Sequence, residues 1–476
     1  MQIKSLLLFS VGIILFTSCK KSNVNSDPTA NDEIHDFIWS GMNTYYLWQE
    51  DVPDLADGRF ATYQQLWSYY AGYESPSDVF NSLLYQPGTV DRFSWIVDDY
   101  VALENSFQGI NVSSGMEFGL VRFNSIPSDI FGYVRYVVAG SDAESKGITR
   151  GMLFTEVDGT QITENNYRDL LFGSNLSYTI TLADYNDGDP VSNGNSISLT
   201  KTQIQENPVH LVTTITEGSH KIGYLMYNQF ASSFDGDLNA AFATLQSENI
   251  TDLIVDLRYN GGGSVRTATY LGGMVTGQFD GELFSREIWN LKVQEAIDES
   301  NFVNNFTNQI NNGAINEAIN SLNLSRVYFI TTYSSASASE LVMNSLSSYI
   351  DVKSVGATTR GKVHGSATLY DSDNFTRNGD NLNPNHSWAM QPLVLEIVNA
   401  NGSNDPNGIT PTVELDEDYS NLGTLGDRSD PLIDRTVILI TTGSRSSAAK
   451  STNFHEEVSN SQINKPSKNN MYLDLD

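Results

Sequence analysis

The fold that this sequence predicts is decided by one stretch, Val327-Tyr-Phe-Ile-Thr-Thr-Tyr-Ser-Ser-Ala-Ser-Ala-Ser-Glu-Leu-Val-Met. Its first six residues are apolar, aromatic or β-branched, which predicts a short buried strand. Small residues follow, and the stretch ends in Leu341-Val-Met, which is typical of a helix. The stretch is therefore a turn from a strand into a helix.

The same alternation extends outward from this turn. Residues 222–227 and 253–258 are two further apolar strand candidates, and Leu238, Ala241, Phe242 and Leu245 mark one face of a helix between them. Strands that alternate with helices predict a mostly parallel sheet covered by helices. Residues 201–440 are therefore expected to form an α/β core, in which the Asn- and Asp-rich residues 371–385 form a loop.

The turn itself contains a candidate nucleophile, Ser337. A helix begins there, and the unpaired N–H groups and dipole of a helix N-terminus favour negative charge. Small neighbours let a substrate backbone approach closely, as a serine nucleophile with an oxyanion beside it requires. A serine at a helix start is, however, more often only a cap.

Two other segments carry residues of catalytic interest. Leu257-Arg-Tyr-Asn-Gly-Gly-Gly-Ser places three glycines at a strand end, where backbone N–H groups can form an oxyanion hole or a plain structural turn. A phosphate-binding loop is excluded, because the Gly-Lys-Ser/Thr of a P-loop is missing. Lys362 follows Ser337 by 25 residues, within Thr359-Arg-Gly-Lys-Val-His-Gly-Ser. A lysine is a general base only where burial lowers its pKa.

Together, the glycine turn, the Ser-Ala-Ser-Glu helix start and the Gly-Lys pair resemble the C-terminal processing, or tail-specific, serine protease family. The resemblance implies a crotonase-like (ClpP/crotonase-type) α/β core and a Ser-Lys dyad. It implies that Ser337 is the nucleophile, that Lys362 is the base, and that the N–H groups of Ala338 and Gly262 bind the oxyanion. No cofactor and no metal are implied.

Two positions depart from that family. Ser348 replaces an aspartate often found late in the serine-bearing helix, and Ser366 replaces a glutamine four residues after the lysine. Both changes affect hydrogen bonds that support the dyad. His364 is a candidate cleft residue rather than a triad base, because the sequence has no Gly-x-Ser-x-Gly elbow. A catalytically inactive peptide- or glycan-binding protein on the same fold stays open as the alternative.

Residues 105–200 form short β-type runs separated by Gly, Asn and Asp turns, and they resemble a PDZ domain. The resemblance is carried by residues 139–159, which include the turn Asp158-Gly159. A plain all-β spacer is the competing interpretation. A carboxylate-binding loop for a peptide C-terminus is expected at six residues: Gly115, Met116, Glu117, Phe118, Gly119 and Leu120.

The N-terminal sequence is typical of an export signal. Leu6 to Phe16 is a short apolar run after Lys4, which is typical of a signal peptide rather than a membrane span. The residues before Cys19, the sole cysteine, resemble a lipobox, so Cys19 is the expected lipid attachment site; secretion with an incidental cysteine is the alternative. The implied location is the bacterial cell envelope, as a periplasmic or outer-membrane lipoprotein.

The sequence has 476 residues and a net charge of −30, which argues against a nucleic-acid partner. The family resemblance implies protein or peptide substrates. Spaced acids near residues 184–189 and 371–380 match no calcium loop, and no zinc pattern is present. The residues after about 440 are polar and are expected to fray. The expected divisions are a signal peptide (1–18), a lipid-anchored tether (19–30), a helical domain (31–104), a PDZ-like domain (105–200), the core (201–440) and a polar tail (441–476).

Overall fold

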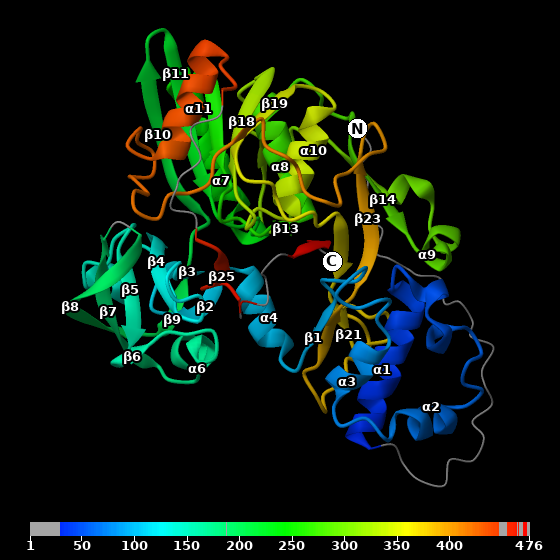
Figure 1. Ribbon diagram of the computed structural model, residues 1–476. Helices are drawn as coiled ribbons and strands as arrows, with labels where there is room; N and C mark the ends of the chain where they lie inside the picture. Colours follow the sequence, from blue (N-terminus) through cyan, green and yellow to red (C-terminus); the bar gives the residue numbers. More distant parts are fainter. Residues whose placement is uncertain (1–28, 187, 447–454, 464, 466–469, 474–476) are drawn as a thin grey trace.

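The computed structural model describes residues 29–446 except residue 187, together with residues 455–463, 465 and 470–473 (Figure 1). The predicted signal peptide, Cys19 and nearly all of the predicted tether lie outside these residues. In the segments described, we find no helix with both the length and the apolar character that crossing a membrane requires.

Three helices build the N-terminal unit: α1 (Ala30–Tyr45), α2 (Tyr63–Tyr70) and α3 (Pro76–Ser82). Helix α1 begins inside the segment expected to be a tether, because Thr29 and Asp32 form a capping box there. Its apolar stripe of Ile34, Ile38 and Met42 is buried and forms the core of this unit. Two 3-10 turns, Gln49–Asp51 and Pro53–Leu55, connect α1 to α2.

A small sheet attaches the N-terminal unit to the rest of the molecule. Strand β1 (Trp95–Val97) pairs antiparallel with β22 (Ala389–Gln391), which pairs with β21 (Leu369–Tyr370). Helix α4 (Tyr100–Phe107) then leads to the β-rich unit (Figure 1). Helix α4 therefore crosses the predicted domain boundary at residue 104.

The β-rich unit is built on a sheet of order β25-β3-β4-β5-β7-β8, with β6 paired to β5. The turn Asp158-Gly159 has positive φ at both residues and closes the hairpin from β5 to β6, as the sequence predicts. A separate pair, β2 with β9, lies beside it. The elements are β2 (Ile110–Ser113), β3 (Met116–Arg122), β4 (Ile130–Val137), α5 (Asp142–Ser145), β5 (Leu153–Val157), β6 (Thr160–Gln161), α6 (Tyr167–Phe172), β7 (Ser177–Asn186), β8 (Asp189–Thr200), β9 (Thr202–Gln205) and β25 (Glu457–Asn460).

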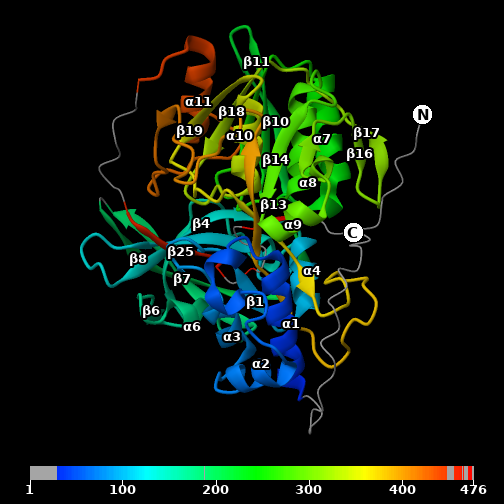
Figure 2. The same cartoon turned by 90° about the vertical axis from the view of Figure 1, so that its right-hand side faces the viewer.

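The core sheet has the order β10-β11-β12-β18-β19-β24, and all its pairs are parallel except β10 with β11. Side chains alternate across it: one face packs against α7, α8 and α10 and the other against α11 (Figures 1 and 2). The mostly parallel α/β core is therefore as expected. The elements are β10 (Val209–Glu217), β11 (His220–Tyr227), a 3-10 turn (Ser232–Phe234), α7 (Asp235–Ser247), β12 (Asp252–Asp256), α8 (Val265–Thr276), β18 (Arg326–Thr331), α10 (Ala338–Ser347), β19 (Asp351–Gly356), β24 (Val413–Glu414) and α11 (Pro431–Thr442).

A second sheet, of order β13-β26-β20-β23-β14-β15, runs between the core and the N-terminal unit. Its strand β26 comes from the C-terminal segment and is drawn as the short red arrow near the label C in Figure 1. The elements are β13 (Gly263–Ser264), β14 (Leu283–Trp289), α9 (Leu291–Ala296), a 3-10 turn (Glu299–Asn301), β15 (Val303–Asn305), β20 (His364–Ala367), β23 (Leu393–Asn399) and β26 (Met471–Leu473), with the hairpin β16 (Gln309–Asn311) and β17 (Asn316–Ala318) at the edge.

The C-terminal segment differs from expectation, because in its described part it does not fray. Strand β25 joins the β-rich sheet, and β26 is enclosed between two strands of the second sheet. Met471 and Tyr472 are buried, which explains why this polar segment is ordered there: it covers apolar surface and satisfies sheet edges.

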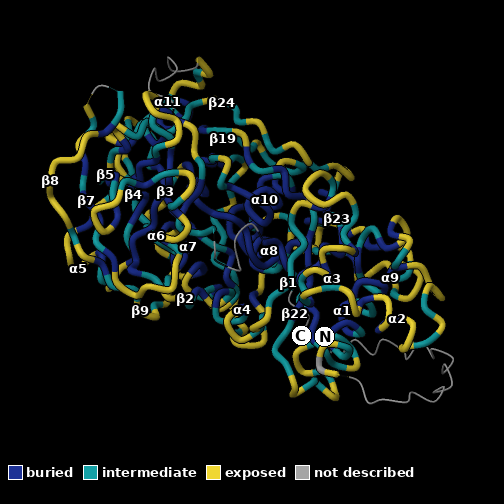
Figure 3. Tube along the Cα trace, turned by 60° about the horizontal axis from the view of Figure 1, so that its bottom comes forward, coloured by how far each residue is buried: buried dark blue, intermediate teal, exposed yellow. Residues whose placement is uncertain are grey.

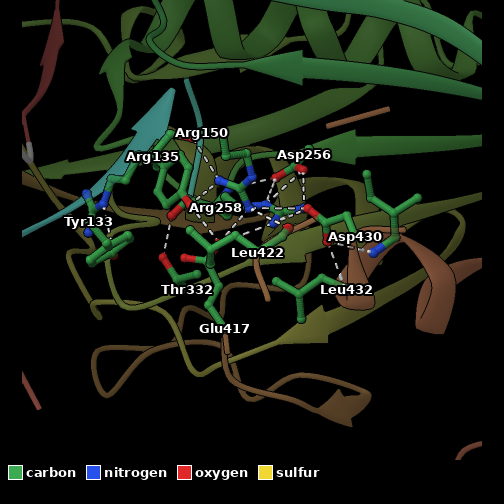
Figure 4. Close-up of polar contacts among 12 residues, drawn as sticks. Tyr133, Arg135, Arg150, Asp256, Arg258, Thr332, Glu417, Leu422, Asp430 and Leu432 are labelled. Atoms are coloured by element: carbon green, nitrogen blue, oxygen red, sulfur yellow. Dashed lines mark hydrogen bonds and ion pairs between the residues drawn. The ribbon is translucent and has the colours of Figure 1, made fainter. Parts of the chain in front are cut away.

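A buried cluster of charges joins the core to the β-rich unit (Figure 4). Arg258, at the end of β12, is fully buried and forms ion pairs with Asp256, Asp430 and Glu417 at 2.7, 2.8 and 3.2 Å. Arg150 of the β-rich unit pairs with the same Glu417 and Asp430. Because charges this deep are stable only when paired, the cluster fixes how the two units meet.

Candidate active site

Ser337 lies in the turn between β18 and α10, and α10 is largely buried, as its dark blue trace in Figure 3 shows. It is fully buried, and its backbone has φ +66° and ψ −117°, which is strained for any residue other than glycine. The strand-turn-helix that the sequence predicts is present, with Ser337 immediately before the first residue of α10. Strain at this position turns the serine side chain away from a regular helix start, as in other nucleophile turns.

Lys362 lies in the loop between β19 and β20 and is 1% exposed. Burial lowers the pKa of Lys362 to about 7, and the nearby negative charges of Asp91 and Glu340 offset this only in part. The Phe93 ring lies 5.2 Å from its Nζ atom. The amine therefore loses its proton near neutral pH, as a general base must.

Ser337 and Lys362 line one cleft, together with Glu340, Leu341, Val363 and Met471. The two side chains are not hydrogen bonded to each other, since Ser337 Oγ has no partner among the described residues. Lys362 Nζ instead donates to Asn470 Oδ1, at 3.4 Å. Catalytic hydrogen bonds are often long or absent in a chain without substrate, so this geometry is compatible with a dyad.

Glu340 holds the two loops together. Its carboxylate accepts hydrogen bonds from the backbone N–H of Ser337 at 2.7 Å, of Gly361 at 2.6 Å and of Lys362 at 2.9 Å, and from Thr359 Oγ1 at 2.5 Å. It fixes the serine turn against the lysine loop and is a positioning residue. Glu340 has no predicted role, although the capping-box spacing Ser-x-x-Glu is a signal in the sequence that indicates it.

The N-terminal unit covers the lysine. Arg92 donates to the carbonyl oxygen of Gly361 at 3.0 Å, and Phe93 and Asp91 approach Lys362 from the same segment. Asp91 is itself buried and accepts a hydrogen bond from Tyr46 Oη at 2.7 Å. No local pattern in residues 91–93 predicts this contact with the loop of Gly361 and Lys362, about 270 residues later.

The glycine turn approaches the serine turn closely. Gly262 has φ +110°, and a Cβ atom there would lie 2.6 Å from Ser337 Cβ, so only glycine fits. Its N–H, however, donates to Asn260 Oδ1 at 2.9 Å. The predicted role of Gly262 as an oxyanion donor therefore requires Asn260 to release this bond. Ala338 is the first residue of α10, where a helix provides no partner for its N–H.

Other predicted site residues lie elsewhere. His364 packs edge-on against Trp48, with ring centroids 5.1 Å apart, and is not among the described cleft-lining residues. Burial lowers the pKa of His364, so it stays neutral. Ser348 ends α10, and its Oγ accepts a bond from Asn401 Nδ2 at 3.1 Å. Ser366 lies beside the cleft and donates to Asn470 Oδ1 at 2.7 Å.

The predicted carboxylate-binding loop forms a turn at Gly115, with φ +82°, and then strand β3. Its Glu117 is buried and pairs with Lys465 of the C-terminal segment at 2.8 Å. The N–H of Phe118 donates to Ser461 Oγ, at 3.1 Å. The structure therefore places this loop against the chain's own C-terminal segment.

These features define a mixed α/β protein with a buried serine and a buried lysine in one cleft. Residues 221–415 match the domain described as Peptidase family S41, and residues 33–95 match the Peptidase S41 N-terminal domain. The chain thus carries two domains of the S41 peptidase family, and the predicted resemblance to the C-terminal processing proteases is confirmed.

Individual proteins are similar to this chain as well. The structure is similar to a putative S41 protease from Bacteroides fragilis, with a TM-score of 0.66 and 24% identity, over 89% of this chain and 100% of that one. This likeness confirms the mixed α/β fold. The chain is 27% identical over 135 residues to the chloroplastic C-terminal processing peptidase of Tetradesmus obliquus, a match that spans 26% of this chain and 29% of that protein. The photosystem II D1 C-terminal processing protease also matches, with a TM-score of 0.49 and 17% identity, over 85% of this chain and 100% of that one.

Proposed function

We propose that this chain is a serine-type endopeptidase of the C-terminal processing kind, with Ser337 as nucleophile and Lys362 as general base. One observation carries the proposal: the two buried side chains line one cleft, and the pKa of the lysine is about 7. A buried amine that is neutral near physiological pH can accept the proton of a serine hydroxyl. The S41 domain matches support the same activity.

The reaction is acyl transfer. Neutral Lys362 takes the proton of Ser337 Oγ while that oxygen bonds to the carbonyl carbon of the peptide. The N–H of Ala338, and an N–H of the glycine turn, stabilise the charge on the carbonyl oxygen. The C–N bond then breaks, and the lysine returns its proton to the leaving amine. Water, deprotonated by Lys362, finally hydrolyses the ester and restores the serine.

The finer assignments belong to the same proposal. The core is crotonase-like, and the β-rich unit at residues 105–200 is PDZ-like and recognises an extended peptide at β3. The substrates are proteins or peptides, and their recognition by a C-terminus remains the prediction for the loop at residues 115–120. Cys19 is the lipid attachment site of an envelope lipoprotein.

A labelled serine-reactive phosphonate tests the proposal directly. Purified full-length protein is incubated for hours at about pH 8, where Lys362 is neutral. We expect labelling of Ser337, and we expect Ser337→Ala to lose about a thousand-fold or more in labelling and in hydrolysis of an unfolded protein. Ser347→Ala, an exposed serine on the same helix, is the matched control and keeps both.

Equal labelling of the wild type and Ser337→Ala would exclude the nucleophile assignment. A folded wild type that neither labels nor cleaves would favour the inactive binding protein instead. Melting temperatures of the three proteins show that any loss is chemical.

A further inference from the structure

The C-terminal segment adds a strand to the edge of the β-rich sheet. Strand β25 runs antiparallel to β3, with Glu457 opposite Val121 and Asn460 opposite Gly119. The N–H of Ser461 continues the ladder to the carbonyl oxygen of Phe118, at 2.9 Å. An extended peptide that pairs with an open sheet edge is a general mode of peptide recognition. Here the peptide belongs to the same chain.

Three ion pairs hold this segment. Arg135 of β4, 2% exposed, donates to the Glu457 carboxylate at 2.7 Å. Lys465 pairs with Glu117 at 2.8 Å and with Glu206 at 3.6 Å. Without the C-terminal segment, the buried Arg135 loses its carboxylate partner, and the buried Glu117 and the half-buried Glu206 lose their cation. Leaving buried charges unpaired is strongly unfavourable, so whatever binds here must supply both charges.

The same segment then enters the cleft. Strand β26 lies between β13 and β20, parallel to both, so it bridges the glycine turn and the strand that follows Lys362. A Cβ atom placed on Gly262 would lie 2.6 Å from the Asn470 carbonyl oxygen and 2.6 Å from Ser337 Cβ. The peptide carbonyl of Asn470 and the side chain of Ser337 therefore approach the glycine turn at the same place.

Asn470 also explains why the dyad is not hydrogen bonded. Its Oδ1 accepts from Lys362 Nζ at 3.4 Å and from Ser366 Oγ at 2.7 Å, and it therefore engages the amine that would otherwise face Ser337. Met471, the next residue, is 1% exposed and is part of the cleft lining. One segment thus occupies both the sheet edge and the reacting centre.

The geometry points to an intramolecular ligand: residues 456–463, 465 and 470–473 occupy the peptide-binding track of the enzyme, and a peptide from another molecule binds only after displacing them. The ligand class follows from the contacts. It is an extended peptide with an acidic residue opposite Arg135 and a basic residue opposite Glu117 and Glu206. In the cleft it has a polar residue followed by an apolar residue, at the positions of Asn470 and Met471. This inference rests on the proposed function, whose substrate it describes.

The test is peptide binding in a Ser337→Ala background, in which nothing can be cut. The probe is a fluorescent peptide with the sequence of residues 456–473, and its anisotropy is measured against three chains. The first is full length, the second ends at Asn469 and keeps the partners of Arg135 and Glu117, and the third carries Met471→Asp. Met471→Leu, which conserves volume and polarity, is the matched control.

We expect the chain that ends at Asn469 to bind the probe about ten-fold or more tightly than the full-length chain, because a tethered occupant lowers the fraction of open sites. Met471→Asp gives an intermediate gain, and Met471→Leu gives none. A probe in which the glutamate and lysine equivalent to Glu457 and Lys465 are exchanged binds at least about ten-fold more weakly.

Equal affinity of all chains for the probe overturns the inference. It is also overturned if the truncated and Met471→Asp chains do not bind the probe although their melting temperatures stay near that of the full-length chain. Should truncation unfold the chain, Met471→Asp alone decides the question. The readout needs no hydrolysis, so tail-dependent binding without proteolysis would reject the proposed function while keeping the inference. Proteolysis without tail dependence would do the reverse.

Discussion

Two buried basic side chains in this molecule, Lys362 and Arg258, have pKa values that are shifted in opposite directions. Burial lowers the pKa of both Lys362 and Arg258, but three carboxylates around Arg258 outweigh burial and hold the pKa of the guanidinium well above its usual range. Around Lys362 the charges of Asp91 and Glu340 do not outweigh burial, and its pKa falls to about 7. The difference lies in the surrounding charges rather than in the depth: charges that outweigh burial keep a structural cation, and charges that do not leave a reactive amine.

The largest effect is expected when Lys362 is made permanently charged. Lys362→Arg should lower kcat/KM by about a thousand-fold or more, because a guanidinium cannot release its proton to become a base. Lys353→Arg, in the neighbouring strand β19, is the control and should leave the rate unchanged. Hydrolysis of a labelled unfolded protein gives both rates. Near-normal turnover by Lys362→Arg would remove the lysine from the mechanism.

The structural cation is tested by removing it. Arg258→Met leaves Asp256 buried without its ion-pair partner and leaves Asp430 paired with Arg150 alone, and it should lower the free energy of unfolding by about 3 to 5 kcal/mol. Lys221→Met breaks an exposed pair with Glu248 and should cost about 1 kcal/mol or less. Urea unfolding of both variants measures the difference. Similar losses would mean that the cluster does not fix the junction between the units.

The opposite sign is expected for Lys362→Met. The folded pKa of about 7 lies below the ordinary 10.5, so the unfolded chain binds more protons between these values and burial of the amine costs stability there. The substitution should therefore stabilise the protein by up to about 4 kcal/mol at pH 7 and below. The gain should shrink as the pH rises toward 10.5. A melting-temperature series from pH 6 to 10 checks the trend, and destabilisation at pH 7 would contradict it.

The smallest effect concerns the charges around Lys362. Wild-type activity should rise with pH through about 7 and then level off, as Lys362 loses its proton. Asp91 raises the pKa of Lys362, so Asp91→Asn should move this midpoint toward acid by about 1 unit. The exposed Asp98→Asn is the control. A midpoint that stays in place would show that Asp91 acts only on the fold.

Sequence reasoning succeeded where the signal is local. The strand-turn-helix at Ser337, the glycine turn at residues 261–263 and the stripe on α1 follow from spacing and residue type, because each reports on its own neighbours. It failed where the site depends on distant contacts. Nothing near Asp91 or Asn470 predicts that these residues meet Lys362, since that proximity is created by the tertiary fold.

The polar composition of the C-terminal segment was misleading for the same reason. Lysine and glutamate in such a segment predict exposure to solvent. In the structure, Glu457 pairs with Arg135 and Lys465 pairs with Glu117 of the β-rich unit. For Gly262, the sequence predicts the residue type correctly but not the reason for it. The need for glycine is correct, yet the reason found in the structure is the close approach of Ser337, while its N–H bonds to Asn260.

The cover that residues 91–93 place over Lys362 has a consequence for how the chain matures. Until the N-terminal helices dock, water reaches the amine, which then keeps the high proton affinity of an ordinary lysine. A neutral amine at Lys362 thus requires the docked N-terminal segment, so the chemistry of the site depends on tertiary assembly and not on the serine and lysine alone.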